Sequence, residues 1–169
     1  NVVHSFSTGL IRIPDRHPGQ EEIILIGSGT YVSIYGVDGI LTAHHVAKEL
    51  DQGSSLGVFC VPQEHRIDVP LNCIEVIEIA RGVVESEGPD LSFIRLPPAF
   101  VSEIKAYKLF FNLSRHREKM LNNPLRRHDG VWFICGVPDE LTTEENSQRE
   151  PGRIKSFHSV CGMVAPNRE

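Results

Sequence analysis

The chain has 169 residues, of which 40% are hydrophobic and 23% charged, and its formal net charge is -5 at pH 7. This length accommodates one average domain or two small subdomains, and the composition is that of a globular protein that buries a core. An acidic chain without a basic stripe argues against a nucleic-acid partner, and the densest basic run, residues 115–127, is typical of a solvated face. No apolar run approaches the roughly 18 residues that a membrane span needs, so we expect no membrane partner.

Short strands are predicted along the first two-thirds of the chain. Residues 22–26 form a compact apolar run that ends at a Gly-Ser-Gly sequence, and residues 30–35 alternate with many β-branched and aromatic side chains. A turn signal at residues 36–39 and a resumed strand at 40–42 complete a predicted hairpin. Residues 43–50 favour one or two helical turns. Four further strands are predicted, at residues 56–61, 66–71, 73–80 and 91–96.

The last third of the chain has fewer regular patterns. Residues 113–121 predict a charged helix that connects two subdomains, and residues 131–135 predict a strand. Residues 141–152 are polar and acidic and indicate an exposed loop, whereas residues 153–164 return to strand-like sequence. Many short strands at nearly regular spacing, without a βαβ rhythm, predict an all-β sandwich or barrel.

Two short stretches contain residue types suited to acid–base chemistry. In the first, His44 and His45 directly follow a predicted buried strand, which holds a histidine rigidly enough to act as a general base. In the second, Asp90 stands immediately before an apolar strand. A carboxylate in that position can accept the Nδ1 proton of a nearby imidazole, fix its tautomer and stabilise the imidazolium.

These stretches resemble a known family. Residues 41–46 (Leu-Thr-Ala-His-His-Val) resemble the catalytic-histidine motif of trypsin-like peptidases, Leu-Thr-Ala-Ala-His-Val. Residues 90–96 (Asp-Leu-Ser-Phe-Ile-Arg-Leu) resemble the family's aspartate motif, Asp-Leu-Ala-Val-Leu-Arg-Leu. Residues 27–32 are similar to the Gly-Ser/Thr-Gly strand that precedes the histidine, and residues 136–138 to a turn in the second barrel. The order of histidine before aspartate is that of chymotrypsin.

The resemblance implies an all-β, two-barrel Greek-key fold of the chymotrypsin type. Residues 1–106 would form the first barrel with both motifs, and residues 107–169 a connecting helix and the start of a second barrel that the chain leaves incomplete. The implied activity is that of a serine endopeptidase acting on a protein or peptide substrate. In this family the histidine corresponding to His45 is the general base and then the general acid, and Asp90 is its orienting partner. No cofactor or metal is implied.

Two departures from the family pattern qualify this interpretation. His44 stands where the family usually has alanine, and the motif register then selects His45 as the base. The nucleophile motif Gly-x-Ser-Gly-Gly is absent from the chain. We expect the serine to lie downstream; the alternatives are a non-catalytic protease-like module that binds proteins, or a nucleophile within the chain, for which Ser159 and Cys161 are the candidates. Cys161 lies in an apolar run that is more typical of a strand.

The cysteines and remaining histidines indicate no further site. The cysteines form no CxxC pair and lie in apolar stretches, so we expect them to be small, buried and reduced; they are Cys60, Cys73, Cys135 and Cys161. Their small number and the lack of a visible export signal favour the cytoplasm. Adjacent His44 and His45 cannot both point at one metal ion, and no HExxH motif is present.

Overall fold

The computed structural model describes residues 2–14, 23–60, 65–83, 86–122, 132–136, 142–147, 150–157 and 160–164. Strands predominate in this part of the chain, and their pairings are antiparallel apart from a short parallel contact between β2 and β8. The strands are β1 (Ser7–Ile13), β2 (Ile24–Ile34), β3 (Val37–Thr42), β4 (Ser55–Cys60), β5 (His65–Pro70), β6 (Glu75–Val83), β7 (Ser86–Arg95), β8 (Phe111–Asn112), β9 (Trp132–Gly136), β10 (Thr142–Ser147), β11 (Glu150–Phe157) and β12 (Val160–Val164). The α-helices are α1 (His44–Lys48), α2 (Pro98–Ile104) and α3 (Leu113–Asn122).

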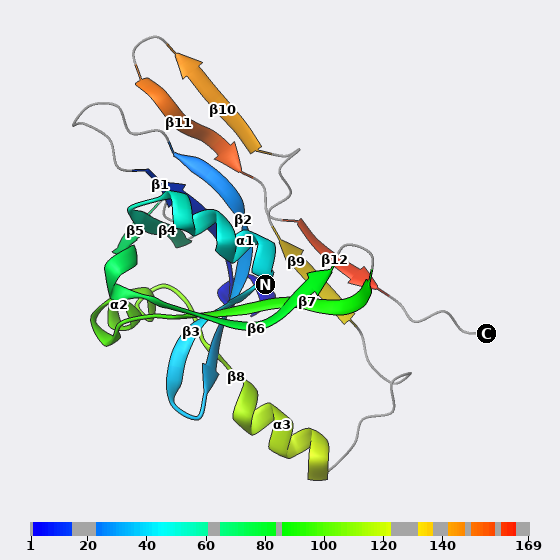
Figure 1. Ribbon diagram of the computed structural model, residues 1–169. Helices are drawn as coiled ribbons and strands as arrows, with labels where there is room; N and C mark the ends of the chain where they lie inside the picture. Colours follow the sequence, from blue (N-terminus) through cyan, green and yellow to red (C-terminus); the bar gives the residue numbers. More distant parts are fainter. Residues whose placement is uncertain are drawn as a thin grey trace.

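One curled sheet dominates the fold (Figure 1). Its strand order is β5-β4-β1-β2-β3-β7-β6, with β8 paired to β2. Helix α2 contacts both β3 and β5, which are far apart in that order, so the sheet must bend around to bring them to the same helix. The mostly antiparallel β architecture predicted from the sequence is therefore confirmed.

The curled sheet encloses a single hydrophobic core. Five different strands each contribute a fully buried side chain to it: Leu10, Tyr31, Ile40, Leu56 and Ile94. Helices α1 and α2 close the core with Val46 and Ile104. Because burying one aliphatic side chain stabilises the fold by about 1.5–3 kcal/mol, this shared core holds strands together that are distant in sequence.

The predicted hairpin is present, but its two runs before the turn are one strand. β2 continues from residue 24 to 34 through the glycines that were expected to end it, with an irregularity in its pairing to β1 near Gly27. The turn consists of Tyr35 and Gly36, which have φ of 48° and 82°, and not of residues 36–39 as predicted, because β3 already begins at Val37. Positive φ at both positions matches the right-handed twist of paired strands, so the turn joins β2 to β3 tightly.

The helical predictions are confirmed for residues 43–50 and 113–121, where the structure has α1 with a following 3₁₀ turn (Glu49–Gln52) and α3. Helix α2 was not predicted, because Pro97 and Pro98 indicated only the end of a strand. Pro98 instead occupies the first turn of α2, where its missing N–H costs nothing. Among the described residues, no helix is long and apolar enough to cross a membrane.

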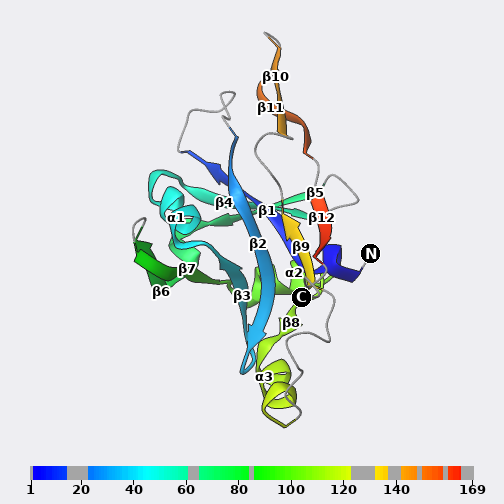
Figure 2. The same ribbon diagram turned by 90° about the vertical axis from the view of Figure 1, so that its right-hand side faces the viewer.

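The C-terminal strands form two small antiparallel pairs, β9 with β12 and β10 with β11 (Figure 2). β9 lies near β1 and β2 of the main sheet. The exposed loop expected at residues 141–152 is wrong as a backbone assignment, because β10 and the start of β11 occupy it. Residues 153–164 divide between β11 and β12. Hydrophobic periodicity missed β10 because its Thr-Thr-Glu-Glu-Asn-Ser sequence contains no apolar residue, although its backbone pairs with β11.

Candidate functional site

The register of β3 and β7 places the two motifs side by side. β3 pairs with β7 so that Thr42, the last residue of β3, lies opposite Ser92. The chain then passes through extended Ala43, with φ of -66° and ψ of 146°, and enters α1 at His44. The first turn of α1 therefore begins beside β7, next to Ser92. Asp90 lies two residues before Ser92 on the same strand.

Gly27 allows α1 to sit close to β2. A Cβ atom at this position would lie 2.8 Å from Val46 Cγ2, and Gly27 has a φ of +150°, which side chains rarely adopt. Nearby, the Thr42 hydroxyl donates a hydrogen bond of 2.8 Å to the carbonyl oxygen of Ser28. Gly27, the first glycine of the Gly-Ser-Gly sequence, thus lets the helix that carries both histidines pack closely against the sheet.

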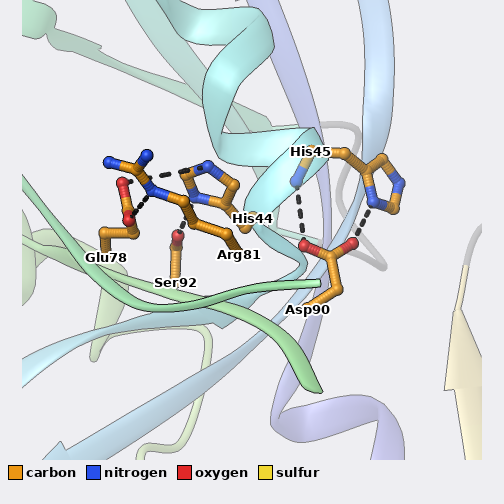
Figure 3. A network of polar contacts seen from close by, with 6 residues as sticks. All are labelled: His44, His45, Glu78, Arg81, Asp90 and Ser92. Carbon is orange, nitrogen blue, oxygen red and sulfur yellow. Dashed lines mark hydrogen bonds and ion pairs between the residues drawn. The ribbon is translucent and has the colours of Figure 1, made fainter. Parts of the chain in front are cut away.

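His45 and Asp90 meet as the sequence motifs predicted (Figure 3). The Nδ1 atom of the His45 ring contacts Asp90 Oδ2, and the His45 backbone N–H donates a hydrogen bond of 3.2 Å to Asp90 Oδ1. Both carboxylate oxygens therefore face His45. The hydrogen bond from the ring is the main reason that the pKa of Asp90 is lowered from its ordinary value, and backbone N–H groups of the two histidines add to it.

The arrangement leaves the other nitrogen of the His45 ring open. The His45 side chain is 74% exposed and that of Asp90 33%. A carboxylate on Nδ1 assigns the ring proton to that nitrogen, so Nε2 carries a lone pair that can accept a proton. Among the described residues, no side chain forms a hydrogen bond or ion pair with Nε2. The pair has the chemistry of a general base with its orienting acid.

His44 makes a second set of polar contacts on the opposite side of α1 (Figure 3). Its Nδ1 lies 3.0 Å from Ser92 Oγ, and its Nε2 lies 3.9 Å from Glu78 Oε2. Glu78 is in turn paired with Arg81, and this ion pair lowers the pKa of Glu78. The motif register predicted that His45, not His44, is the base, and Ser92 was not identified from the sequence. The signal was available, because residues 90 and 92 alternate onto the same face of a strand.

Serine, histidine and a carboxylate also form the residue set of a hydrolase triad, but the geometry around His44 excludes that role. Ser92 is fully buried, with a relative exposure of 0%, so its hydroxyl cannot attack a substrate. The acid lies on Nε2 and the serine on Nδ1, which is the reverse of the chymotrypsin arrangement. The contact between His44 and the buried Ser92 is therefore structural, and Glu78 at the other end of the set is partly exposed.

The other candidate residues are placed as follows. Ser159 lies outside the described residues, and Cys161 is a β12 residue whose backbone lies opposite Cys135 in β9. Cys60 is free and buried, as expected, and burial raises the pKa of its thiol. Cys73 is free but exposed, so the expectation of burial is wrong for it. It belongs to a surface 3₁₀ turn (Leu71–Cys73) rather than to β6.

No cluster of three or more His, Cys, Asp or Glu side chains able to hold a metal ion occurs within the described ranges.

In comparisons with protein-family models and with curated proteins, nothing matches the chain.

Proposed function

We propose that this chain supplies the general base and orienting acid of a trypsin-like serine endopeptidase. The observation that carries the proposal is the contact of His45 Nδ1 with Asp90, together with an open Nε2 on the same ring. A triad needs both features, because the acid holds one ring nitrogen of the histidine and the other ring nitrogen exchanges a proton with the nucleophile. The sheet supports the proposal by bringing β3 and β7 together at the required ends.

The proposed reaction proceeds by acyl transfer. A serine from outside the described residues attacks the scissile carbonyl carbon while its hydroxyl proton passes to His45 Nε2. Asp90 stabilises the resulting imidazolium without taking the proton. The imidazolium then donates that proton to the leaving amine as the C–N bond breaks, and water repeats the sequence to release the acid. Such acid–base assistance contributes about 10²- to 10⁴-fold to a rate.

The proposal includes a chymotrypsin-type fold and its division into two barrels. The curled antiparallel sheet is compatible with the first barrel of a chymotrypsin-type fold, for which the sequence predicted residues 1–106. β8, at residues 111–112, still pairs with this sheet. The small β9–β12 pair is compatible with the start of a second barrel within residues 107–169. We propose protein or peptide substrates and a cytoplasmic location.

A second candidate function is a protease-like module that binds a protein without cleaving it. The observation that favours it is that, in the part of the chain that the structure describes, no hydroxyl or thiol lies against His45 Nε2. Fold alone does not decide between the two, because the same scaffold serves both.

The deciding experiment uses a fluorophosphonate probe, which reacts with activated serines. We expect the full-length gene product to be labelled on a serine beyond residue 169, and His45→Ala to abolish the labelling. The isolated 169-residue chain should remain unlabelled. Labelling of that chain at Ser159 would move the nucleophile into it. Failure to label either form, with peptidase activity also absent, would favour the binding module; activity that thiol alkylation removes would indicate Cys161.

A further inference from the structure

Two contacts connect the same two segments of backbone. His44 and His45 are consecutive residues at the start of α1, and Ser92 and Asp90 are alternate residues of β7. His45 contacts Asp90, and His44 contacts Ser92 at 3.0 Å. Figure 3 shows the two rings on opposite sides of the helix start, each reaching its own partner on β7.

The two contacts differ in burial. Ser92 is completely buried and the His44 side chain is only 13% exposed. The His45 side chain is 74% exposed. Water and salt screen an exposed ion pair, so the contact between His45 and Asp90 cannot by itself hold α1 against β7 firmly. The hydrogen bond between His44 and Ser92 is part-buried, and breaking it would leave the fully buried Ser92 hydroxyl without a partner, which costs more than breaking an exposed contact.

The tautomer of His44 follows from its two neighbours. Ser92 can donate its hydroxyl proton to Nδ1, which leaves the ring proton on Nε2, facing Glu78. Arg81 of β6 pairs with Glu78, and Lys48 of α1 is the other charged group near this carboxylate. The ring of His44 thus has a hydrogen-bond partner at Nδ1 and a carboxylate 3.9 Å from Nε2, beyond hydrogen-bond distance.

We propose that His44 and Ser92 are a positioning pair that holds the first turn of α1 against β7 and so keeps His45 in contact with Asp90. This inference rests on the proposed function, because the contact that is held is the one between base and acid. His44 and Ser92 touch no substrate. Their loss lets the helix start move relative to the strand, which lowers the fraction of molecules with a formed pair.

Two substitutions of His44 separate its contacts. In His44→Asn the side-chain amide lies near the place of Nδ1 and retains a hydrogen bond to Ser92. In His44→Gln the amide lies near the place of Nε2, so the bond to Ser92 is lost while contact with Glu78 remains. Ser92→Ala removes the other partner. Thr8→Val is the matched control, because the buried hydroxyl of Thr8 bonds the Phe59 carbonyl at 3.1 Å, away from α1.

The first measurement is the NMR titration of the Asp90 carboxyl carbon in the 169-residue chain. In the unsubstituted chain the midpoint should lie below that of an ordinary aspartate. Ser92→Ala and His44→Gln should move it upward, whereas His44→Asn and Thr8→Val should leave it unchanged. If Ser92→Ala fails to fold, the comparison of the two His44 variants decides alone. Equal midpoints for His44→Asn and His44→Gln would overturn the positioning pair.

The second measurement is peptidase activity of the full-length protein. Ser92→Ala and His44→Gln should lower kcat about three- to tenfold with little change in KM, since small displacements of a base are expensive in rate. If fluorophosphonate labels the full-length protein but Ser92→Ala and His44→Gln leave the Asp90 midpoint unchanged, the positioning pair alone is rejected. Shifted midpoints without any labelling would reject the peptidase alone. An ordinary Asp90 midpoint in the unsubstituted chain, together with no labelling, would reject both.

Discussion

The start of α1 contacts β7 at two places, which we call the two sides of the junction: His44 with Ser92, and His45 with Asp90. The two sides contain similar residue types but differ in burial. On the buried side, His44 lies between Ser92 and Glu78, with serine, histidine and acid all present. On the exposed side, His45 has only its acid, Asp90. The His44 set has every residue type of a triad, but its serine is fully buried. Access, and not the residue list, decides which histidine can act as a base.

The geometry of a helix and of a strand explains why neighbouring residues of α1 and of β7 form two separate contacts. Consecutive residues of a helix point about 100° apart, so His44 and His45 leave α1 in different directions. Alternate residues of a strand share a face, so Asp90 and Ser92 both point from β7 toward the helix. One side can be buried for rigidity while the other stays open for chemistry.

The largest expected effect comes from removing the exposed histidine. In the full-length protein, His45→Ala should lower kcat by about 10⁴- to 10⁶-fold, as loss of the base does in serine peptidases. His44→Ala, the control on the buried side, should retain activity within about tenfold. Steady-state kinetics on a peptide substrate measures both. The reverse ranking would show that His44 is the base.

Asp90→Asn should have the next largest effect. Asparagine keeps the shape of the side chain but can donate to the ring and favour the wrong tautomer, so kcat should fall on the order of 10³- to 10⁴-fold. Asp68→Asn is the control, because Asp68 is an exposed β5 residue paired with Arg66 at 2.7 Å. A loss below about tenfold for Asp90→Asn, read at saturating substrate, would remove Asp90 from the triad.

Gly27→Ala should weaken both sides of the junction together. The added methyl group would meet Val46 and push α1 away from the sheet, at a cost of about 1–3 kcal/mol in the free energy of unfolding. Gly36→Ala is a matched control, because Gly36 also has positive φ, at +82°, but no atom within 4 Å of the added group. Urea unfolding measures stability, and the Asp90 carboxyl titration reports on the junction. If the two variants titrate alike, α1 is not held through Gly27.

The smallest effect concerns pH. The pKa of Asp90 is lowered in the folded chain, so its contact with His45 stabilises the fold above the ordinary aspartate pKa of about 3.9. That contribution is lost as the pH falls through the lowered value, because the carboxylate becomes protonated. Unfolding free energies of the unsubstituted chain and Asp90→Asn, measured between pH 6 and 2, should therefore converge on acidification. A difference independent of pH would contradict the contact.

Local patterns in the sequence were sufficient for several elements. Alternating apolar residues and a turn signal predicted the β2–β3 hairpin, and the charged pattern of residues 113–121 predicted α3. The motifs predicted that His45 and Asp90 would meet. β1 was not assigned, although its Leu10 and Ile11 are fully buried, because the first five residues of this strand are buried on both faces and its sequence does not alternate.

The sequence alone determined the residue types available for chemistry and the spacing that puts a histidine after one strand. It predicted Asp90 immediately before the next apolar strand, which was wrong, because β7 begins at Ser86 and Asp90 lies inside it. Only the tertiary structure decided which histidine is open, because exposure depends on strands that are distant in the chain. The pairing of Thr42 with Ser92 sets β7 beside α1, and β6 then adds Glu78 to cover His44. Periodicity within a segment cannot encode such a register, since it arises from packing of the whole sheet around one core.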